Sequence, residues 1–222
     1  YCMQKCFKCF SIIGSKVMNA IGIIPARLGA TRFPGKPLAK ILGIPMVGHC
    51  YHRTKLALGC SSTYVATCDN EIADYIDSIG GKFVMTSSDH TRATTRTAEA
   101  IEHIEKKTKE KIDIVVMVQG DEPLIAPEAI KNILSNFEDP SVEIVNIMSR
   151  IQSYDQFVDR NNVKVVVNNK SDALYFSREP IPSPWKGVDN FSMYMQTGII
   201  AFRKKTLSKF NSMNETMLEQ IE

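Results

Sequence analysis

The chain has 222 residues, of which 44% are hydrophobic and 23% charged, so its composition allows an ordinary globular core. Its 27 basic and 24 acidic residues leave a net charge of +3, a balance too even for a protein that coats nucleic acid or a membrane surface. Because no apolar run approaches the ~18 residues of a membrane helix and the N-terminus lacks a secretory pattern, we expect a cytoplasmic protein with neither nucleic acid nor membrane as partner.

From residue 20 onward, short apolar runs alternate with helical patterns. Continuous apolar strands that alternate with helices predict an α/β fold, with a mostly parallel twisted sheet and helices on both faces. Ligands of such sheets bind beyond the carboxyl ends of the strands, so the loops there should carry the chemistry. In chain order, we predict a strand at 20–25, a helix at 45–57, a strand at 63–67, a helix at 71–79, a strand at 82–86, a helix at 95–107 and a strand at 112–118.

The pattern changes after residue 140. Longer loops separate the predicted strands, and the segment 178–186 is too rich in proline for a helix. A second lobe or an excursion from the main sheet fits this change, and we keep a single domain over residues 18–222. The predicted strands are 142–148, 163–167, 173–176 and 198–202.

The first 17 residues stand apart from this pattern. They hold three cysteines spaced C-x3-C-x2-C, as in some iron–sulfur motifs, but no strand precedes them. We favour a non-native or dispensable extension over residues 1–17, with the natural start at Met18. The other cysteines, Cys50, Cys60 and Cys68, are scattered, and we expect them to be reduced.

A basic loop follows the first predicted strand. Arg27, Arg32 and Lys36 lie within ten residues of one another, and Gly29 and Gly35 allow the backbone to approach a ligand closely. A triphosphate needs several such donors, since its charge must be offset while the bond to the leaving pyrophosphate breaks. The loop is not a Walker A motif, because a proline follows Lys36. The alternative is a solvated basic loop.

A carboxylate follows the most apolar strand. Asp121 belongs to the sequence VQGDEP (118–123), at the point where that strand ends. A carboxylate there faces the ligand crevice and can hold a Mg2+ ion that bridges phosphate oxygens. Taken alone the motif is also an ordinary turn, but together with the basic loop it indicates a nucleotide site.

These two motifs carry a resemblance to a known family. PARLGATRFPGKPL (25–38) and VQGDEPLI (118–125) are similar to the CMP-Kdo synthetases, the 3-deoxy-manno-octulosonate cytidylyltransferases. The similarity continues through VATCDNEIADYIDSIGG (65–81), MTSSDH (85–90), NNVKVVVNNKSDALYFSREPIP (161–182) and DNF (189–191). It implies a Rossmann-like fold of the nucleotide-diphospho-sugar transferase type.

The resemblance also implies the reaction and its components. CMP would pass from CTP to the anomeric hydroxyl of Kdo with release of pyrophosphate, for lipopolysaccharide or capsule synthesis, with Mg2+ and usually as a homodimer. It implies catalytic roles for Arg27, Lys36 and Asp121, with Asp121 as the metal ligand. The implied nucleotide-binding residues are Pro25, Ala26, Arg27, Arg32, Lys36, Asp69, Thr94, Arg96 and Gly120, and the implied sugar-binding residues are Gln119, Tyr175, Arg178 and Gln196.

Four departures from the family bear on the substrates. Cys68-Asp69 stands where the family has two acids, and Arg92-Ala93-Thr94 stands where it has Ser-Gly-Thr. Thr95 replaces an acid before Arg96, and Gln196 replaces a histidine near the sugar. Gln196 can form hydrogen bonds but cannot carry a positive charge. Another acidic acceptor, such as a different ulosonate or a phosphonate, therefore stays open, as does a catalytically weak binding domain of the same fold.

The resemblance also bears on the C-terminal end of the chain. In the family, a second metal-binding aspartate lies C-terminal to the point that matches residue 222. We expect the chain to lack this C-terminal segment.

Overall fold

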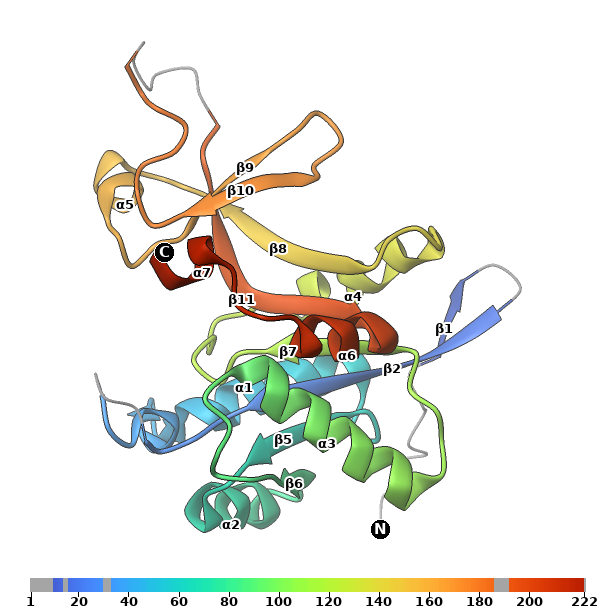
Figure 1. Cartoon of the computed structure of the whole chain (residues 1–222). Helices are drawn as coiled ribbons and strands as arrows, with labels where there is room; N and C mark the ends of the chain where they lie inside the picture. Colours follow the sequence, from blue (N-terminus) through green and yellow to red (C-terminus); the bar gives the residue numbers. More distant parts are fainter. Residues whose placement is uncertain (1–9, 14–15, 30–32, 186–191, 222) are drawn as a thin grey trace. The chain divides into compact units, whose positions relative to one another are not determined.

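The structure is a computed structural model that describes residues 10–13, 16–29, 33–185 and 192–221 (Figure 1). These residues divide into two compact units. The first unit holds the described residues up to Val145 together with Gly198–Ser212. The second holds the described residues of Asn146–Thr197 and of Met213–Glu222. The boundary at residues 145–146 lies close to residue 140, after which the sequence pattern changes.

The first unit is built on a mostly parallel sheet, as the sequence predicts. Strand β7 is buried over its whole length, as its run of five apolar residues requires. Strand β11 lies antiparallel to β7 and β1 antiparallel to the start of β2, while the remaining neighbours are parallel. The order is β11-β7-β2-β5-β6, with β1 (Phe10–Ile13), β2 (Lys16–Pro25), β5 (Thr63–Thr67), β6 (Phe83–Met85), β7 (Ile114–Val118) and β11 (Tyr194–Arg203).

Helices cover both faces of this sheet because successive residues of a strand point to opposite sides. A Cβ atom at Gly22 would lie 2.6 Å from Thr54 and 2.9 Å from Leu58, both on α1. The neighbouring Ile21 and Ile23 instead pack against α3. Helices α2 and α4 pack on α1, and α6 packs on α3. The helices of this unit are α1 (Met46–Leu58), α2 (Asn70–Ser78), α3 (Ala93–Thr108), α4 (Pro127–Ser135) and α6 (Lys204–Ser212), with two 3-10 turns, η1 (Lys36–Leu38) and η2 (Asn136–Glu138).

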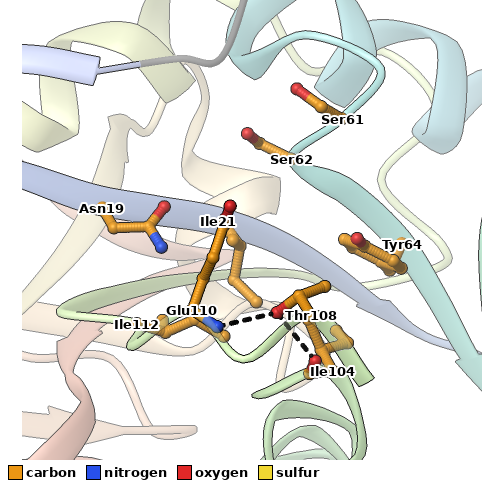
Figure 2. Close-up of a pocket in the computed structure, with 9 residues that line it drawn as sticks. All are labelled: Asn19, Ile21, Ser61, Ser62, Tyr64, Ile104, Thr108, Glu110 and Ile112. Atoms are coloured by element: carbon orange, nitrogen blue, oxygen red, sulfur yellow. Dashed lines mark hydrogen bonds between the residues drawn. The ribbon is translucent and has the colours of Figure 1, made fainter. Parts of the chain in front are cut away.

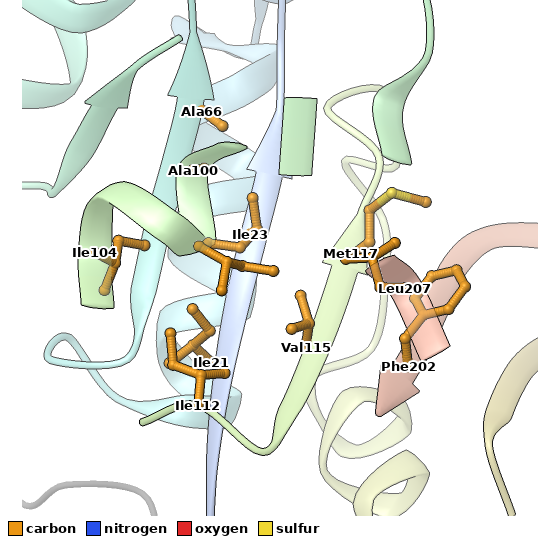
Figure 3. Close-up of a cluster of buried hydrophobic side chains, with 11 residues drawn as sticks. Ile21, Ile23, Ala66, Ala100, Ile104, Ile112, Val115, Met117, Phe202 and Leu207 are labelled. Atoms are coloured by element: carbon orange, nitrogen blue, oxygen red, sulfur yellow. The ribbon is translucent and has the colours of Figure 1, made fainter. Parts of the chain in front are cut away.

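The core between the sheet and α3 is a continuous apolar cluster (Figure 3). It joins alternate residues of β2 and β7 to the inward face of α3 and to α6. Burial of this surface fixes α3 on the sheet, and therefore fixes the loop that leads into its first turn. The buried members are Ile21, Ile23, Ala66, Ala100, Ile101, Ile104, Ile112, Val115, Met117, Phe202 and Leu207.

The second unit is smaller and antiparallel. Strand β9 pairs with β10 and with the first residues of β11, and β8 also pairs with β11. Phe157 is fully buried against Ile151 and Met193. Lys164 is also fully buried, and its ammonium donates to the carbonyl oxygens of Asp159 and Arg178. The elements are β8 (Ile144–Arg150), α5 (Tyr154–Val158), β9 (Lys164–Val167), β10 (Ala173–Ser177) and α7 (Met217–Ile221).

Every strand and helix predicted above is present, with ends that shift by a few residues. Elements that the sequence analysis did not predict are β1, the short pair β3 (Lys40–Ile41) and β4 (Ile44–Pro45), the two 3-10 turns, and α4 to α7. Cys50 and Cys68 are free thiols, whereas Cys60 is disulfide-bonded, so the prediction of a reduced thiol is wrong for Cys60. None of the described helices combines the length and the apolar character needed to cross a membrane.

Candidate active site

A cleft of about 480 Å3 lies in the first unit, at the carboxyl ends of its parallel strands. That volume is within the range of small-molecule sites, and the place is the one where open α/β sheets bind ligands. The loops after β2, β6 and β7 form its walls, together with the first turn of α3. Its lining is Pro25, Ala26, Arg27, Lys36, Pro37, His90, Thr91, Arg92, Ala93, Arg96, Gln119, Gly120 and Asp121.

The basic loop after β2 is held in shape by its own backbone and by one carboxylate. Asp69 Oδ2 accepts a hydrogen bond of 2.7 Å from the Leu28 amide. The Gly35 amide donates to the Leu28 carbonyl at 3.1 Å, which closes the loop. Gly35 has φ +72°, a conformation that a residue with a Cβ rarely adopts. These contacts fix the position at which Lys36 enters the cleft.

Lys36 and Asp121 meet across the cleft. Lys36 Nζ lies 2.7 Å from Asp121 Oδ2, and the two side chains are 37% and 42% exposed. Gly120 brings the two strand ends together, since a Cβ there would lie 3.1 Å from the carbonyl oxygen of Pro25. The pair therefore places one cation and one accessible carboxylate at the junction of β2 and β7.

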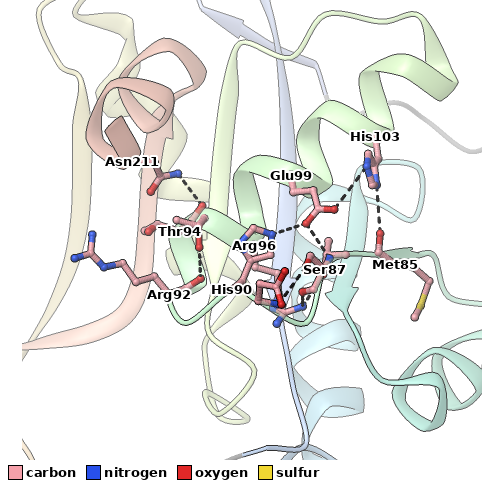
Figure 4. A network of polar contacts seen from close by, with 12 residues as sticks. Met85, Ser87, His90, Arg92, Thr94, Arg96, Glu99, His103 and Asn211 are labelled. Atoms are coloured by element: carbon pink, nitrogen blue, oxygen red, sulfur yellow. Dashed lines mark hydrogen bonds and ion pairs between the residues drawn. The ribbon is translucent and has the colours of Figure 1, made fainter. Parts of the chain in front are cut away.

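Arg27, Arg92 and Arg96 add positive charge to the described wall, and Arg27 and Arg96 differ in their burial. Arg27 is exposed, and its guanidinium donates to the His90 carbonyl at 3.4 Å. Arg96 is only 2% exposed and donates to Thr86 Oγ1 at 2.5 Å and to the Ser87 carbonyl at 3.2 Å (Figure 4). Its buried NH2 nitrogen has no hydrogen-bond partner among the described residues. A buried donor without a partner is costly, so this nitrogen is well suited to a ligand acceptor.

Glu99 of α3 lies behind this wall. Burial raises the pKa of its carboxyl. Hydrogen bonds from the Ser87 amide and His90, together with the charges of His90 and His103, lower the pKa by more than burial raises it, so the pKa lies below its usual value. A carboxyl with a depressed pKa stabilises the fold above its unfolded pKa, and that contribution is lost as the pH falls through the folded pKa.

This sign gives a prediction for acid stability. The difference in unfolding free energy between the wild-type protein and Glu99→Gln should have its largest value at neutral pH. It should shrink as the pH falls below the usual glutamate pKa of about 4.3. Urea unfolding followed by circular dichroism over a pH series measures the difference. A difference that stays constant down to the acid transition would contradict the assignment.

The structure brings eight of the predicted site residues together in the cleft. Asp69 supports the basic loop, and the Thr94 carbonyl accepts a hydrogen bond from Asn211 at 3.0 Å, so neither belongs to the described lining. Arg32 lies outside the described residues. The eight cleft residues are Pro25, Ala26, Arg27, Lys36, Arg96, Gln119, Gly120 and Asp121.

Three of the predicted sugar-binding residues belong to the second unit. Tyr175 lies on β10 opposite Val166 of β9, and the Gln196 amide donates to the Val163 carbonyl at 2.8 Å. Arg178 follows β10 and donates to the Arg160 carbonyl at 3.0 Å. Tyr175 and Gln196 therefore lie on the strands that flank β9 within this unit, and Arg178 comes directly after one of those strands.

Part of the wall was not predicted from the sequence. Pro37, Thr91 and Ala93 line the cleft, and Glu99 contacts the loop behind it. The spacing of Arg96 and Glu99 is a signal that could have identified Glu99, because residues three apart lie on the same side of a helix.

Other features of the first unit are poor candidates for the site. A second cavity, lined by Asn19, Ser62 and Ile112 among others, lies at the amino ends of the strands and has about 30 Å3, room for roughly one water (Figure 2). Burial raises the pKa of the Cys50 thiol to about 12, so this thiol stays protonated near neutral pH and is a poor nucleophile.

Known proteins resemble this chain in fold and in sequence. A solved CMP:2-keto-3-deoxy-manno-octonic acid synthetase in complex with CTP superposes with a TM-score of 0.80 at 36% identity, over 91% of this chain and 81% of that one. The fold is thus that of an α/β nucleotidyltransferase. The sequence profile described as cytidylyltransferase matches residues 21–222. The chain belongs to the cytidylyltransferase family.

Relatives similar in sequence to this chain include octulosonate cytidylyltransferases. The 3-deoxy-manno-octulosonate cytidylyltransferase of Escherichia coli is 37% identical over 92% of this chain and 80% of its own length. The 8-amino-3,8-dideoxy-manno-octulosonate cytidylyltransferase of Shewanella piezotolerans is 40% identical over 92% and 83%. The resemblance found in the sequence is therefore confirmed.

Proposed function

We propose that the chain transfers CMP from CTP to the anomeric hydroxyl of Kdo, giving CMP-Kdo and pyrophosphate. The observation that carries this proposal is the cleft itself, whose described lining holds four lysine and arginine side chains and an accessible carboxylate at the carboxyl ends of the strands, in a chain of this family. The product would serve lipopolysaccharide or capsule synthesis. We also propose that the enzyme works in the cytoplasm as a homodimer, as the family resemblance implies.

The cleft residues suit a triphosphate. Lys36 and Arg27 project from the basic loop and can pair with phosphate oxygens. The first turn of α3 contributes Ala93 and lies beside Thr91 and Arg92, and the free amides of a helix N-terminus attract anions. The buried Arg96 leaves one nitrogen for an acceptor atom of the nucleotide. Together these groups offset the charge of CTP and of the departing pyrophosphate.

Mg2+ fits this arrangement with Asp121 as its protein ligand. The described residues contain no group of three or more metal-binding side chains, which suits an ion usually held by one or two carboxylates and by substrate phosphates. When bound, the ion would neutralise phosphate charge. Asp121 is accessible, and Lys36 Nζ is its neighbour, so both groups can serve the same phosphates.

The chemistry needs positioning more than a nucleophilic side chain. The anomeric hydroxyl attacks the α-phosphorus, a new P–O bond forms, the bond to the β-phosphate oxygen breaks, and the hydroxyl proton is released. Direct displacement of this kind depends mainly on alignment and charge stabilisation. Gln119 at the end of β7 lines the same cleft and is proposed to contact the acceptor. Sugar-binding roles for Tyr175, Arg178 and Gln196 are proposed from the family resemblance alone.

A second acceptor is favoured by one observation. Curated relatives at 40% identity include the 8-amino-3,8-dideoxy-manno-octulosonate cytidylyltransferases of Shewanella piezotolerans and Shewanella sediminis. The amino sugar differs from Kdo at one substituent, and the same cleft could act on it.

An acceptor panel tests the proposal. Pyrophosphate release with Mg2+ and CTP, UTP, ATP or GTP should be highest with CTP and Kdo. The panel includes the 8-amino sugar, another ulosonate and a phosphonate. A higher kcat/KM with the amino sugar would select the second acceptor. CTP binding without pyrophosphate release on any acceptor would favour a catalytically weak binding domain. Higher pyrophosphate release with ATP than with CTP would contradict CTP as the donor.

A further inference from the structure

A tight turn between β6 and α3 forms one wall of the cleft, and a single carboxylate holds it. Glu99 Oε2 accepts a hydrogen bond of 2.9 Å from the Ser87 amide, at the start of the turn. The same oxygen contacts His90 Nε2, at its end. Ser87 Oγ accepts a hydrogen bond of 3.1 Å from the Asp89 amide, which closes the turn from inside (Figure 4). Glu99 therefore ties both ends of residues 87–90 to the second turn of α3.

The carbonyl groups of this turn accept hydrogen bonds from two arginines of the cleft, Arg27 and Arg96. The Ser87 carbonyl accepts from Arg96 NH1 at 3.2 Å, and the His90 carbonyl accepts from Arg27 NH1 at 3.4 Å. Arg96 is buried, whereas Arg27 is exposed. An exposed arginine has many rotamers, so a fixed acceptor near its head limits the directions in which it points. The position of each carbonyl depends in turn on the carboxylate behind it.

We propose that Glu99 is a positioning residue that orients Arg27 and Arg96 toward the nucleotide through the 87–90 turn. It touches no part of the substrate and acts through the backbone carbonyls of Ser87 and His90. The inference rests on the proposed function, because it assigns both arginines to CTP. It adds to that function a carboxylate on α3 that sets the geometry of the cleft.

The environment of Glu99 supports a role behind the wall. Its side chain is 25% exposed, and the apolar contacts of α3 fix the backbone that carries it. The carboxylate has a second neighbour in His103, at 3.8 Å from Oε1. His103 contacts the Met85 carbonyl at 3.2 Å and does not reach the turn, so it provides a matched control on the same helix.

CTP binding is the first test. Calorimetry should show that Glu99→Ala weakens CTP binding by about tenfold or more, since it would misalign the charge-assisted hydrogen bonds of two arginines with the triphosphate. Glu99→Gln keeps a carbonyl oxygen for the Ser87 amide and should restore part of the affinity. His103→Gln should bind CTP within twofold of wild type. The KM for the acceptor should change less than the KM for CTP.

A double-mutant cycle separates positioning from a general loss of structure. If Glu99 acts through Arg27, Glu99→Ala should cost clearly less CTP affinity in an Arg27→Ala background than in the wild-type protein. A general structural loss would instead add to the effect of Arg27→Ala. If Glu99→Ala does not fold, Glu99→Gln and His90→Asn replace it in the same cycle.

Different results would contradict the proposed function and the positioning role of Glu99. Wild-type protein that does not bind CTP would contradict the proposed function. Wild-type protein that binds CTP while folded Glu99→Ala or Glu99→Gln binds it within twofold would overturn the inference alone. Additive costs in the cycle would also overturn it.

Discussion

Replacing Asp121 by asparagine should reduce the proposed Mg2+-dependent CMP transfer by roughly 10²–10³-fold, the range seen when one preorganised charge-stabilising group is lost. The amide keeps the shape of the carboxylate but loses the charge that a Mg2+ ion needs. Stability should change little, because the pair with Lys36 is more than a third exposed on both sides, and exposed ion pairs contribute ~0–1 kcal/mol.

The same variant should have an opposite effect on binding without metal. Asp121 places a negative charge beside the position proposed for the triphosphate. Without Mg2+, Asp121→Asn should therefore bind CTP more tightly than the wild-type protein does, because one like charge is gone and Lys36 is released from its partner. Calorimetry with EDTA measures this binding, and pyrophosphate release over a Mg2+ series measures the turnover.

Glu122→Gln is the matched control. Glu122 is the next residue, and its Oε1 accepts a hydrogen bond of 3.1 Å from the Gly198 amide. Glutamine keeps an oxygen for that amide, so this variant should show a Mg2+ dependence close to wild type. Near-normal Mg2+-dependent turnover of Asp121→Asn, or an equal loss in both variants, would contradict the role of Asp121.

The sequence predicted the sheet well because burial on two faces leaves a strong signal. All five residues of β7 are apolar and buried, and a short apolar run of that kind predicts a central parallel strand. Helix α4 was missed although its signals were present. Pro127 stands in its first turn, and Ile130, Ile133 and Leu134 recur at helical spacing on its buried side. Helices α5 and α7 have five residues each, too few for a periodic pattern.

The location of the candidate site was predictable from the sequence, but the contacts of its individual residues were not. Sequence position placed Asp69 at a strand end, but it could not indicate that the carboxylate is used by the Leu28 amide. The burial of Arg96 and the contacts of Glu99 with the 87–90 turn arise from tertiary packing of α3, which local patterns do not encode. The cations and Asp121 were found because charged residues behind a buried strand have few purely structural reasons to gather there.

Replacing Lys36 by alanine should weaken CTP binding by about 10- to 150-fold, which corresponds to the ~1.5–3 kcal/mol of a charge-assisted hydrogen bond. Lys36 is the first residue of η1, where the φ of +72° at Gly35 turns the chain into the cleft. Its ammonium is only 2.7 Å from Asp121, so a phosphate drawn there meets both the cation and the proposed metal ligand. The chain offers Lys40 as a control, since it is an exposed lysine of the same segment that does not line the cleft.

Salt dependence adds a signature that separates charge pairing from a change in shape. The CTP affinity of the wild-type protein and of Lys40→Ala should fall in parallel as salt rises, because added ions screen the attraction between the cleft and the triphosphate. The affinity of Lys36→Ala should fall less steeply, since one cation of the cleft is gone. Lys36→Arg keeps the charge and should recover part of the binding. Folded Lys36→Ala that binds CTP within twofold of wild type, with an unchanged salt slope, would remove Lys36 from the triphosphate site and leave the arginines of the cleft to hold it.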